Sequence, residues 1–443
     1  MNNSHNKFFL LIFLGFLIAC NEKGDSVVDG ELYRFNVENQ LNKPVASAAV
    51  TVDLTQFNLQ PGHCSLVLSL VAPNYSEASG ELSNQKELFQ QAATGLEIKD
   101  DLDRREIPSQ CDDLSGDGNS DVLFFLTDFE AGQILNFELK IVAEKPEYQK
   151  RTQAFLKVQS GGNFVNGIYE GGSEMEEVET LDIPNEQVQG SGWAYMEGPV
   201  WESDLVGYRF YLDTRNRVDI FGKSMPDLVL DTISVNYHEI HPWGTDVLVV
   251  GSSLGLGSLA AMKKGEVRTI DNWTSRKFEV PVNGPLRSII RMTYEDWDVF
   301  GHLVSVVSEI EIHAANRYTE HRVSLSGDVD ELILATGIVK HANAEKITIG
   351  DAHYSTFGWT SGDQADQGHG LDMGVVIPME YQPEYLEDDA NTHLFAFRTV
   401  DGKAVYRYTS AWELDHNVVD DFHTHILETA GLFTQPPKVK VEL

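Results

Sequence analysis

Alternation of apolar and polar residues, the period of a β-strand with one buried face, is the dominant pattern of this chain. It is clearest at residues 303–313, where apolar side chains mostly occupy one face and Glu309, Glu311 and His313 lie on the other. Short apolar runs bounded by turn residues predict further strands, at residues 48–54, 66–71, 122–126, 206–212 and 286–294. Residues 82–96 favour a helix, and no helix longer than about three turns is expected after residue 193. The pattern predicts a mainly β protein.

The predicted strands fall into two groups. Residues 31–158 predict a β-sandwich-like N-terminal module, and residues 193–443 predict a large antiparallel β-sandwich that carries the chemistry. Residues 159–192 are rich in glycine and glutamate, which favours a linker over an active-site loop. The length of 443 residues suits two or three domains better than one core.

The first twenty residues have the features of an export signal. Lys7 precedes an apolar run that is too short to span a bilayer and ends in Leu17-Ile18-Ala19-Cys20, which resembles a bacterial lipobox. We expect residues 1–20 to be a lipoprotein signal peptide, Cys20 to carry the lipid and residues 21–30 to form a tether. The protein would then be anchored to the cell envelope, at the outer membrane, facing the periplasm or the cell surface. Ordinary secretion with cleavage nearby is the alternative.

Two further cysteines, Cys64 and Cys111, lie in the predicted N-terminal module. In an oxidising compartment such a pair either forms one disulfide or stays as two thiols, and the sequence leaves both open.

Charge excludes one class of partner. The chain has 33 Lys and Arg against 68 Asp and Glu, a net charge of −35, so a phosphate backbone would be repelled and no nucleic-acid partner is expected. An anionic small substrate would need a local basic site.

A local excess of basic residues does occur between residues 261 and 291. Arg287 and Arg291 are four residues apart on a predicted strand and so share a face. On an earlier strand Arg209 and Tyr211 share a face, and Tyr208 takes the opposite one. Arginine forks match carboxylates and sulfates, although solvated faces or ion pairs with the many acids are the alternative.

Two polar motifs suggest metal ligands. Asp113, Asp117 and Asp121 have the spacing of a calcium loop around Gly118, but Phe124 stands where an EF-hand has its bidentate Glu. This leaves either a smaller structural calcium loop or a polar turn between strands. His238 and His241 have metal-ligand spacing, but the sequence places no third ligand beside them.

Several motifs together resemble one known family. They lie at residues 110–118, 197–203, 208–223, 237–251, 284–288 and 408–413. Their order resembles Bacteroidetes lipoproteins of formerly unknown function from polysaccharide-utilisation clusters, which include ulvan oligosaccharide dehydratases, and the resemblance runs from about residue 30 to the end. It implies an enzyme without a required cofactor, which removes water from the non-reducing-end uronic acid of an anionic oligosaccharide and leaves a 4,5-unsaturated sugar.

Such an elimination needs cations to neutralise the uronate, a base to take the C5 proton and an acid for the departing hydroxyl. The candidates are Arg209, Arg287, Arg291 and Lys223 as cations, His238 with Tyr208 or Tyr211 as base and acid, Tyr294 and His321 behind them, and Trp243 and Trp412 as stacking surfaces. Three alternatives stay open: a polysaccharide lyase, a non-catalytic glycan-binding lipoprotein, and a glycoside hydrolase using Glu197 and Glu202.

Overall fold

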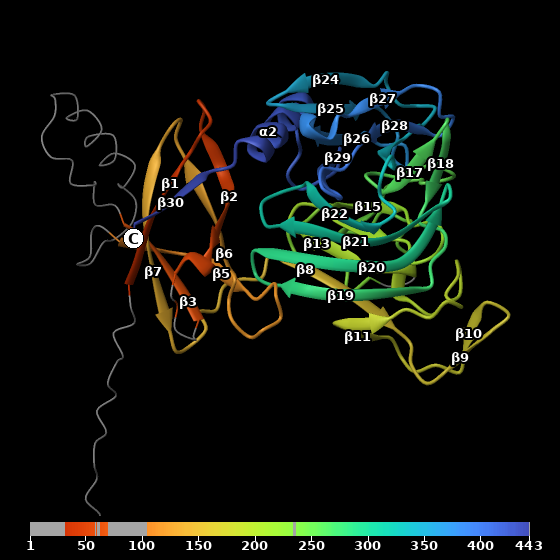
Figure 1. Cartoon of the computed structure of the whole chain (residues 1–443), viewed down its shortest axis with the longest axis horizontal. Coiled ribbons are helices and arrows are strands. Elements are labelled where there is room, and N and C mark those ends of the chain that lie inside the picture. The colour runs from red at the N-terminus through yellow and green to blue at the C-terminus, as the bar shows by residue number, and fades with distance from the viewer. Residues whose placement is uncertain (1–31, 58, 60–62, 70–103, 234–235, 443) are drawn as a thin grey trace, which may run out of the picture.

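The computed structural model describes residues 32–57, 59, 63–69, 104–233 and 236–442. The expected signal peptide with Cys20, the expected tether and the helix expected at residues 82–96 lie outside these ranges. Within them the protein is mainly β, as predicted, and forms a smaller N-terminal sandwich beside a larger body of antiparallel sheets (Figure 1).

The N-terminal sandwich packs two antiparallel sheets around one core. The first has the order β30-β1-β7-β3-β4 and consists of β1 (Leu32–Glu38), β3 (His63–Ser69), β4 (Arg104–Ile107), β7 (Ile134–Val142) and β30 (Lys438–Glu442). The second has the order β2-β6-β5 and consists of β2 (Val45–Asp53), β5 (Ser109–Asp112) and β6 (Val122–Phe129). Phe35, Phe125 and Phe137 meet between them. A disulfide joins Cys64 on β3 to Cys111 on β5, so the cysteines form the disulfide and it links the two sheets.

The larger body has three main sheets. The largest has the order β12-β19-β20-β21-β22-β29-β26-β25-β24, namely Thr180–Asp182, Ser275–Asn283, Arg287–Val299, His302–His313, Thr319–Gly327, Lys403–Trp412, Leu371–Pro378, Ser355–Thr360 and Thr348–Ala352. A second has the order β11-β8-β13-β14-β15-β16, namely Glu176–Val178, Thr152–Val158, Val200–Ser203, Gly207–Phe210, Val218–Lys223 and Gly244–Asp246. A third has the order β18-β17-β23-β28-β27, namely Glu266–Thr269, Ala260–Lys263, Ile333–Val339, Thr392–Phe397 and Glu384–Leu386.

Short elements complete the larger body. They are the hairpin of β9 (Asn163–Val165) and β10 (Ile168–Glu170), the 3-10 turns Tyr195–Glu197 and Met379–Tyr381, and the helix α2 (Phe422–Thr434); a further 3-10 turn, Leu54–Gln56, follows β2. Helix α2 has 13 residues and so slightly exceeds the three turns expected. Asp421 caps its first turn, and Ile426 packs against Gly374 of the largest sheet. None of the described helices is long and apolar enough to cross a membrane.

Two boundaries differ from those the sequence suggests. Strand β8 pairs with β13 and therefore lies in the larger body, although residues 31–158 read as one module. The stretch 159–192 is no simple linker, because β11 pairs with β8 and β12 with β19. In addition, the C-terminal strand β30 returns to the N-terminal sandwich and pairs with β1.

The N-terminal sandwich is fixed to the largest sheet by buried polar contacts. The side-chain carbonyl of Gln110 accepts the backbone N–H groups of Leu286 and Arg287, at 2.8 and 3.0 Å. The carboxylate of Asp112 accepts Nε of Arg287 at 3.0 Å. This contact explains why Glu311 and His313 are buried, although they lie on the more polar of the two faces predicted for β21.

Burial of histidines makes the fold sensitive to acid. Loss of hydration lowers the pKa of His313 and of His321 to about 4, whereas the pKa of a histidine in the unfolded chain is about 6.5. Below pH 6.5 the unfolded chain therefore gains protons that the folded chain does not take up until the pH approaches 4. The contribution of these two neutral histidines to the free energy of unfolding is therefore complete above pH 6.5 and is lost as the pH falls toward 4.

We predict that the free energy of unfolding falls between pH 7.5 and pH 5 by about 2 kcal/mol for each such histidine. Urea unfolding at both pH values measures this. In His321→Gln the fall should be smaller by one histidine's contribution, while His63→Gln, at an exposed position, should behave as wild type. An equal fall in all three proteins would contradict the prediction.

Candidate functional site

One cavity of about 410 Å³ brings three of the predicted residues together, and we call it the His238 cavity. It lies beside β14, β15 and β16. Its lining consists of Gln189, Arg209, Tyr211, Arg215, Arg217, His238, Asp246, Leu248, Val249, Val250, Gly251 and Asp366. Gln189 comes from the stretch 159–192, so part of that stretch belongs to the site.

Arg209 organises the buried side of this cavity. It is 2% exposed, and its Nη2 lies 2.6 Å from Asp219 and 2.9 Å from Asp246. Its Nη1 donates to the hydroxyl of Tyr237 at 2.9 Å. Arg209 and Asp219 are direct cross-strand partners on β14 and β15, so the strand register produces this pair. The guanidinium is therefore already committed to two carboxylates.

Tyr211 lies between two guanidinium groups. The Arg215 guanidinium carbon is 3.8 Å and the Arg209 carbon 4.7 Å from the ring centroid. The hydroxyl donates to Asp219 at 2.7 Å and accepts from Arg209 at 2.9 Å. Burial and then the charge of Asp219 raise the pKa of Tyr211 well above its ordinary value, so the phenol is protonated at neutral pH. Arg209 and Tyr211 do share a face, as predicted.

His238 forms the accessible side of the same cavity. Its side chain is 60% exposed, and its Nδ1 lies 3.5 Å from Oδ2 of Asp246. Its ring packs on Tyr237 with centroids 4.6 Å apart. Burial and then the neighbouring Asp219 raise the pKa of Asp246, while Arg209 opposes the rise. An exposed imidazole backed by a buried carboxyl is an arrangement that can accept and pass on a proton.

Arg217 is the functional candidate that the sequence reasoning missed. Its Nη1 donates to the carbonyl of Gly251 at 2.5 Å, and its Nε has no hydrogen-bond partner. The carboxylates of Asp213 and Glu197 pair with Arg215 instead, so within the described chain Arg217 has no acidic partner. Burial and then the charge of Arg215 lower the pKa of Arg217, while the charge of Asp213 opposes the fall. The signal in the sequence was weak: an arginine in a turn just before a strand.

Other predicted residues lie elsewhere in the larger body. Tyr208 is buried and its hydroxyl donates to the carbonyl of Arg317 at 2.7 Å, on the face opposite to Arg209. Lys223 is fully buried, and its Nζ is 2.5 Å from a carboxylate oxygen of Glu202. Trp412 is buried against Gly222, and Trp243 packs beside His241 with ring centroids 6.0 Å apart. The structure does not bring these side chains into the His238 cavity.

The reserve candidates are also core residues. The hydroxyl of Tyr294 donates to Asn216 at 2.5 Å, and Nδ1 of His321 is 2.7 Å from the hydroxyl of Tyr406. Both side chains are buried and have their polar atoms in hydrogen bonds.

The two arginines of β20 make the ion pairs that the sequence left as an alternative. Arg287 is bound to Asp112 at the contact between the two parts of the protein. Arg291 donates from Nε to Glu309 at 2.9 Å on the neighbouring strand. Neither lines the His238 cavity.

The glutamates of the hydrolase alternative do not face each other across a shared cleft. Glu202 is buried against Lys223, and Glu197 pairs with Arg215 at 3.2 Å.

The aspartates Asp113 and Asp121 of the candidate calcium loop accept hydrogen bonds from backbone N–H groups of the same loop. Asp113 accepts backbone N–H groups from Gly116, at 2.6 Å, and from Gly118, at 2.7 Å. One oxygen of Asp121 accepts those of Leu114 and Ser115, both at 2.8 Å. In the part of the chain that the structure describes, no group of three or more His, Cys, Asp or Glu side chains is placed to hold a metal ion. The loop is built as a polar turn.

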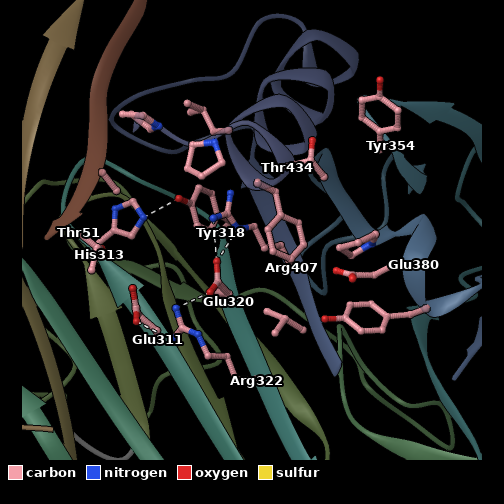
Figure 2. A pocket seen from close by; sticks show the side chains of 18 of the residues that line it. Thr51, Glu311, His313, Tyr318, Glu320, Arg322, Tyr354, Glu380, Arg407 and Thr434 are labelled. Carbon is pink, nitrogen blue, oxygen red and sulfur yellow. Dashed lines mark hydrogen bonds and ion pairs between the residues drawn. The ribbon is translucent and has the colours of Figure 1, made fainter. Parts of the chain in front are cut away.

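A second, larger cavity of about 790 Å³ lies between the two parts of the protein, and we call it the interface cavity (Figure 2). Strands β21, β22 and β29 form its floor, β2 and β6 border it, and the end of α2 with Pro436 and Pro437 forms another wall. Four charged side chains alternate in sign across the floor: Glu311, Arg322, Glu320 and Arg407.

Comparisons with known proteins place the chain in a family. A family model described as a domain of unknown function (DUF4861) matches residues 80–439. A protein of Formosa agariphila called uncharacterized protein P7 is 28% identical over 181 residues, which are 40% of this chain and 44% of that protein. The chain thus matches less than half the length of that relative.

Similar solved structures are remote. A glycosyl hydrolase family 38 protein from Enterococcus faecalis has a TM-score of 0.39 at 7% identity, over 93% of this chain and 47% of its own. A putative aldose 1-epimerase from Klebsiella pneumoniae has a TM-score of 0.27 at 8% identity, over 64% of this chain and 96% of its own. Likenesses of this strength do not bear on function.

We predict that calcium does not support the fold through the loop at residues 113–121, because no three acidic side chains of this described loop are placed to hold one ion together. Thermal unfolding followed with a chelator and then with excess calcium checks this, and one unchanged melting temperature is expected. A melting temperature that drops with chelator and recovers with calcium would show that the loop binds the ion.

Proposed function

The chain belongs to the DUF4861 family, and we propose that it is a hydro-lyase that removes water from the terminal uronic acid of an anionic oligosaccharide. The reaction is assigned to the His238 cavity. One observation carries the proposal: the unpaired guanidinium of Arg217 lines the same cavity as the His238–Asp246 pair. In a chain of net charge −35, a cation without an acidic partner is a specific receptor for an anion.

The carboxylate of the substrate sets the first requirement. The proton at C5 lies next to this carboxylate, and its removal builds further negative charge on the same group. A cation that binds the carboxylate stabilises that charge as it develops. Arg217 supplies the cation through its Nη groups, which can form a bidentate contact with a carboxylate, because its Nε is buried.

The base is His238. The imidazole takes the C5 proton, and the carbon–hydrogen electron pair becomes the C4–C5 double bond as the C4–oxygen bond breaks. Asp246, on the Nδ1 side of the ring, stabilises the imidazolium that forms. The acid is Tyr211, whose hydroxyl turns from Asp219 toward the departing hydroxide, which leaves as water. A phenol of raised pKa keeps its proton at neutral pH, yet hydroxide is a stronger base and takes it.

This assignment refines the roles expected from the sequence. Arg209 positions Tyr211 and the two aspartates instead of binding the substrate, since its guanidinium is already occupied. The identity of the glycan, including an ulvan-type oligosaccharide, and anchoring through Cys20 remain part of the proposal.

We predict that His238→Ala and Tyr211→Phe each lower kcat by about 10²- to 10⁴-fold with little change in substrate binding, because each removes a proton-transfer group. Ultraviolet absorbance of the conjugated uronate measures the rate, with a uronate-ended oligosaccharide as substrate. Lys277→Arg, a charge-conserving change at a half-buried position on β19 outside the cavity, is the control that should keep full activity.

The product decides among the alternatives. Loss of one water without chain cleavage is expected from mass spectrometry. An unsaturated end on a shortened chain would mean a lyase, cleavage without absorbance a hydrolase, and no reaction a binding protein. Full activity in His238→Ala would remove this residue from the mechanism.

We predict that Arg217→Lys lowers kcat/KM by about tenfold or more, because a point charge lacks the bidentate fork. Arg268→Lys is the matched control: Arg268 is exposed and pairs with Glu266 on the surface, so no change is expected. The same assay compares both variants over a range of substrate concentrations. If Arg217→Lys matched wild type, Arg217 would not be the carboxylate receptor.

A further inference from the structure

The interface cavity has a floor of charges that cancel. Arg322 donates from Nη1 to Glu311 at 2.8 Å and pairs through Nη2 with Glu320. Glu320 in turn accepts Nε and Nη2 of Arg407, at 2.9 and 2.7 Å. An ionic ligand would have to break one of these pairs. A neutral polar ligand would not, because a carboxylate has about four acceptor positions and a guanidinium five donors, more than the pairs consume.

The inner end of the cavity is also uncharged. Nε2 of His313 is 2.6 Å from the hydroxyl of Tyr318, whose ring lies 4.1 Å from the Arg407 guanidinium carbon. Burial lowers the pKa of His313 to about 4, so this pair is neutral at physiological pH. Figure 2 shows His313 and Tyr318 on one side of the cavity and Tyr354 and Glu380 on the other.

The rim of the cavity is mostly apolar and aromatic, with the exposed carboxylate of Glu380 beside it. It includes Phe433, Pro436, Pro437, Met379 and Tyr354. Phe433 also packs on Arg407, with the guanidinium carbon 4.3 Å from its ring centroid.

Tyr354 is held at this rim by a strained turn. The two residues between β24 and β25, His353 and Tyr354, both have positive φ, 48° and 58°. Glycine or asparagine usually occupies such positions, and bulky residues there cost about 1 kcal/mol or more each. The Tyr354 carbonyl accepts the Met379 N–H at 2.8 Å, and Thr434 donates to the His353 carbonyl. The turn thus presents an aromatic side chain that is 75% exposed.

We infer that the interface cavity is a binding site for neutral glycosyl residues, distinct from the His238 cavity. A sugar ring has an apolar face for Tyr354 and Phe433 and hydroxyl groups that both donate and accept, which suit the paired carboxylates and guanidinium groups of the floor. A volume of about 790 Å³ lies within the range of about 300–1,000 Å³ typical of ligand sites, which often lie between domains. The site would hold a neutral part of a glycan while the uronate end is processed elsewhere.

Saturation-transfer NMR and calorimetry test this with methyl glycosides and disaccharides of glucose, galactose, mannose and xylose, and with glucuronic acid as the anionic comparison. Binding of at least one neutral probe is expected. Tyr354→Ala should weaken it about fivefold or more, since an aromatic contact is lost, and Glu380→Ala should weaken it as well. Both side chains are exposed, so these variants keep the fold.

Two controls separate this site from the proposed active site. Ile168→Ala, at a residue 49% exposed on the distant hairpin β10, should bind as wild type. His238→Ala should also bind the neutral probe as wild type, whatever its effect on elimination. The inference is overturned if no neutral probe binds, if only glucuronic acid binds, if Tyr354→Ala and Glu380→Ala both leave binding unchanged, or if His238→Ala abolishes it.

Discussion

A charge buried inside a protein must be paired, and this requirement organises the structure of this acidic chain. Arg209 holds Asp219 and Asp246 in place between β14, β15 and β16. Arg287 with Asp112 fixes the N-terminal sandwich to the largest sheet. Lys223 on β15 and Glu202 on β13 form a fully buried pair across the intervening strand β14. Removing one partner of any such pair would leave an isolated buried charge, so these residues are needed whether or not a substrate is present.

Two arginines in the larger body, Arg276 and Arg217, have no ion pair with a carboxylate of the described chain and are therefore exceptions to this requirement. Arg276 is buried without a carboxylate, but carbonyl groups of Leu212, Pro184 and Gln187 and the ring of Trp273 take its place. Arg217 differs, since its guanidinium has a single carbonyl contact, from Nη1 to Gly251, and it lines a cavity. With twice as many acids as bases in the chain, a guanidinium without an acidic partner is a costly feature that a purely structural role does not explain.

The sequence is informative about properties set by neighbours along the chain. Strand periodicity indicated the mainly β fold, the buried face of β21, and the shared face of Arg209 and Tyr211. Periodicity could not indicate which acidic side chain forms an ion pair with which basic side chain. Lys223 and Glu202 come from two strands of one sheet that are separated by β14, and Arg287 and Asp112 meet by contact between two sheets. Arg217 was missed because a turn residue has no periodicity from which to read its direction.

The return of β30 to the N-terminal sandwich constrains how the protein is made. Lys440 pairs with Glu38, which lies 402 positions earlier in the chain. At roughly 5–20 residues per second, a ribosome needs roughly 20 s or more to supply the strand that covers β1. During that time β1 presents an open sheet edge, which invites pairing with other chains. The N-terminal sandwich is therefore synthesised first but is among the last parts to be completed. A chaperone that covers the edge of β1 until β30 has been synthesised would protect the chain from pairing with other chains.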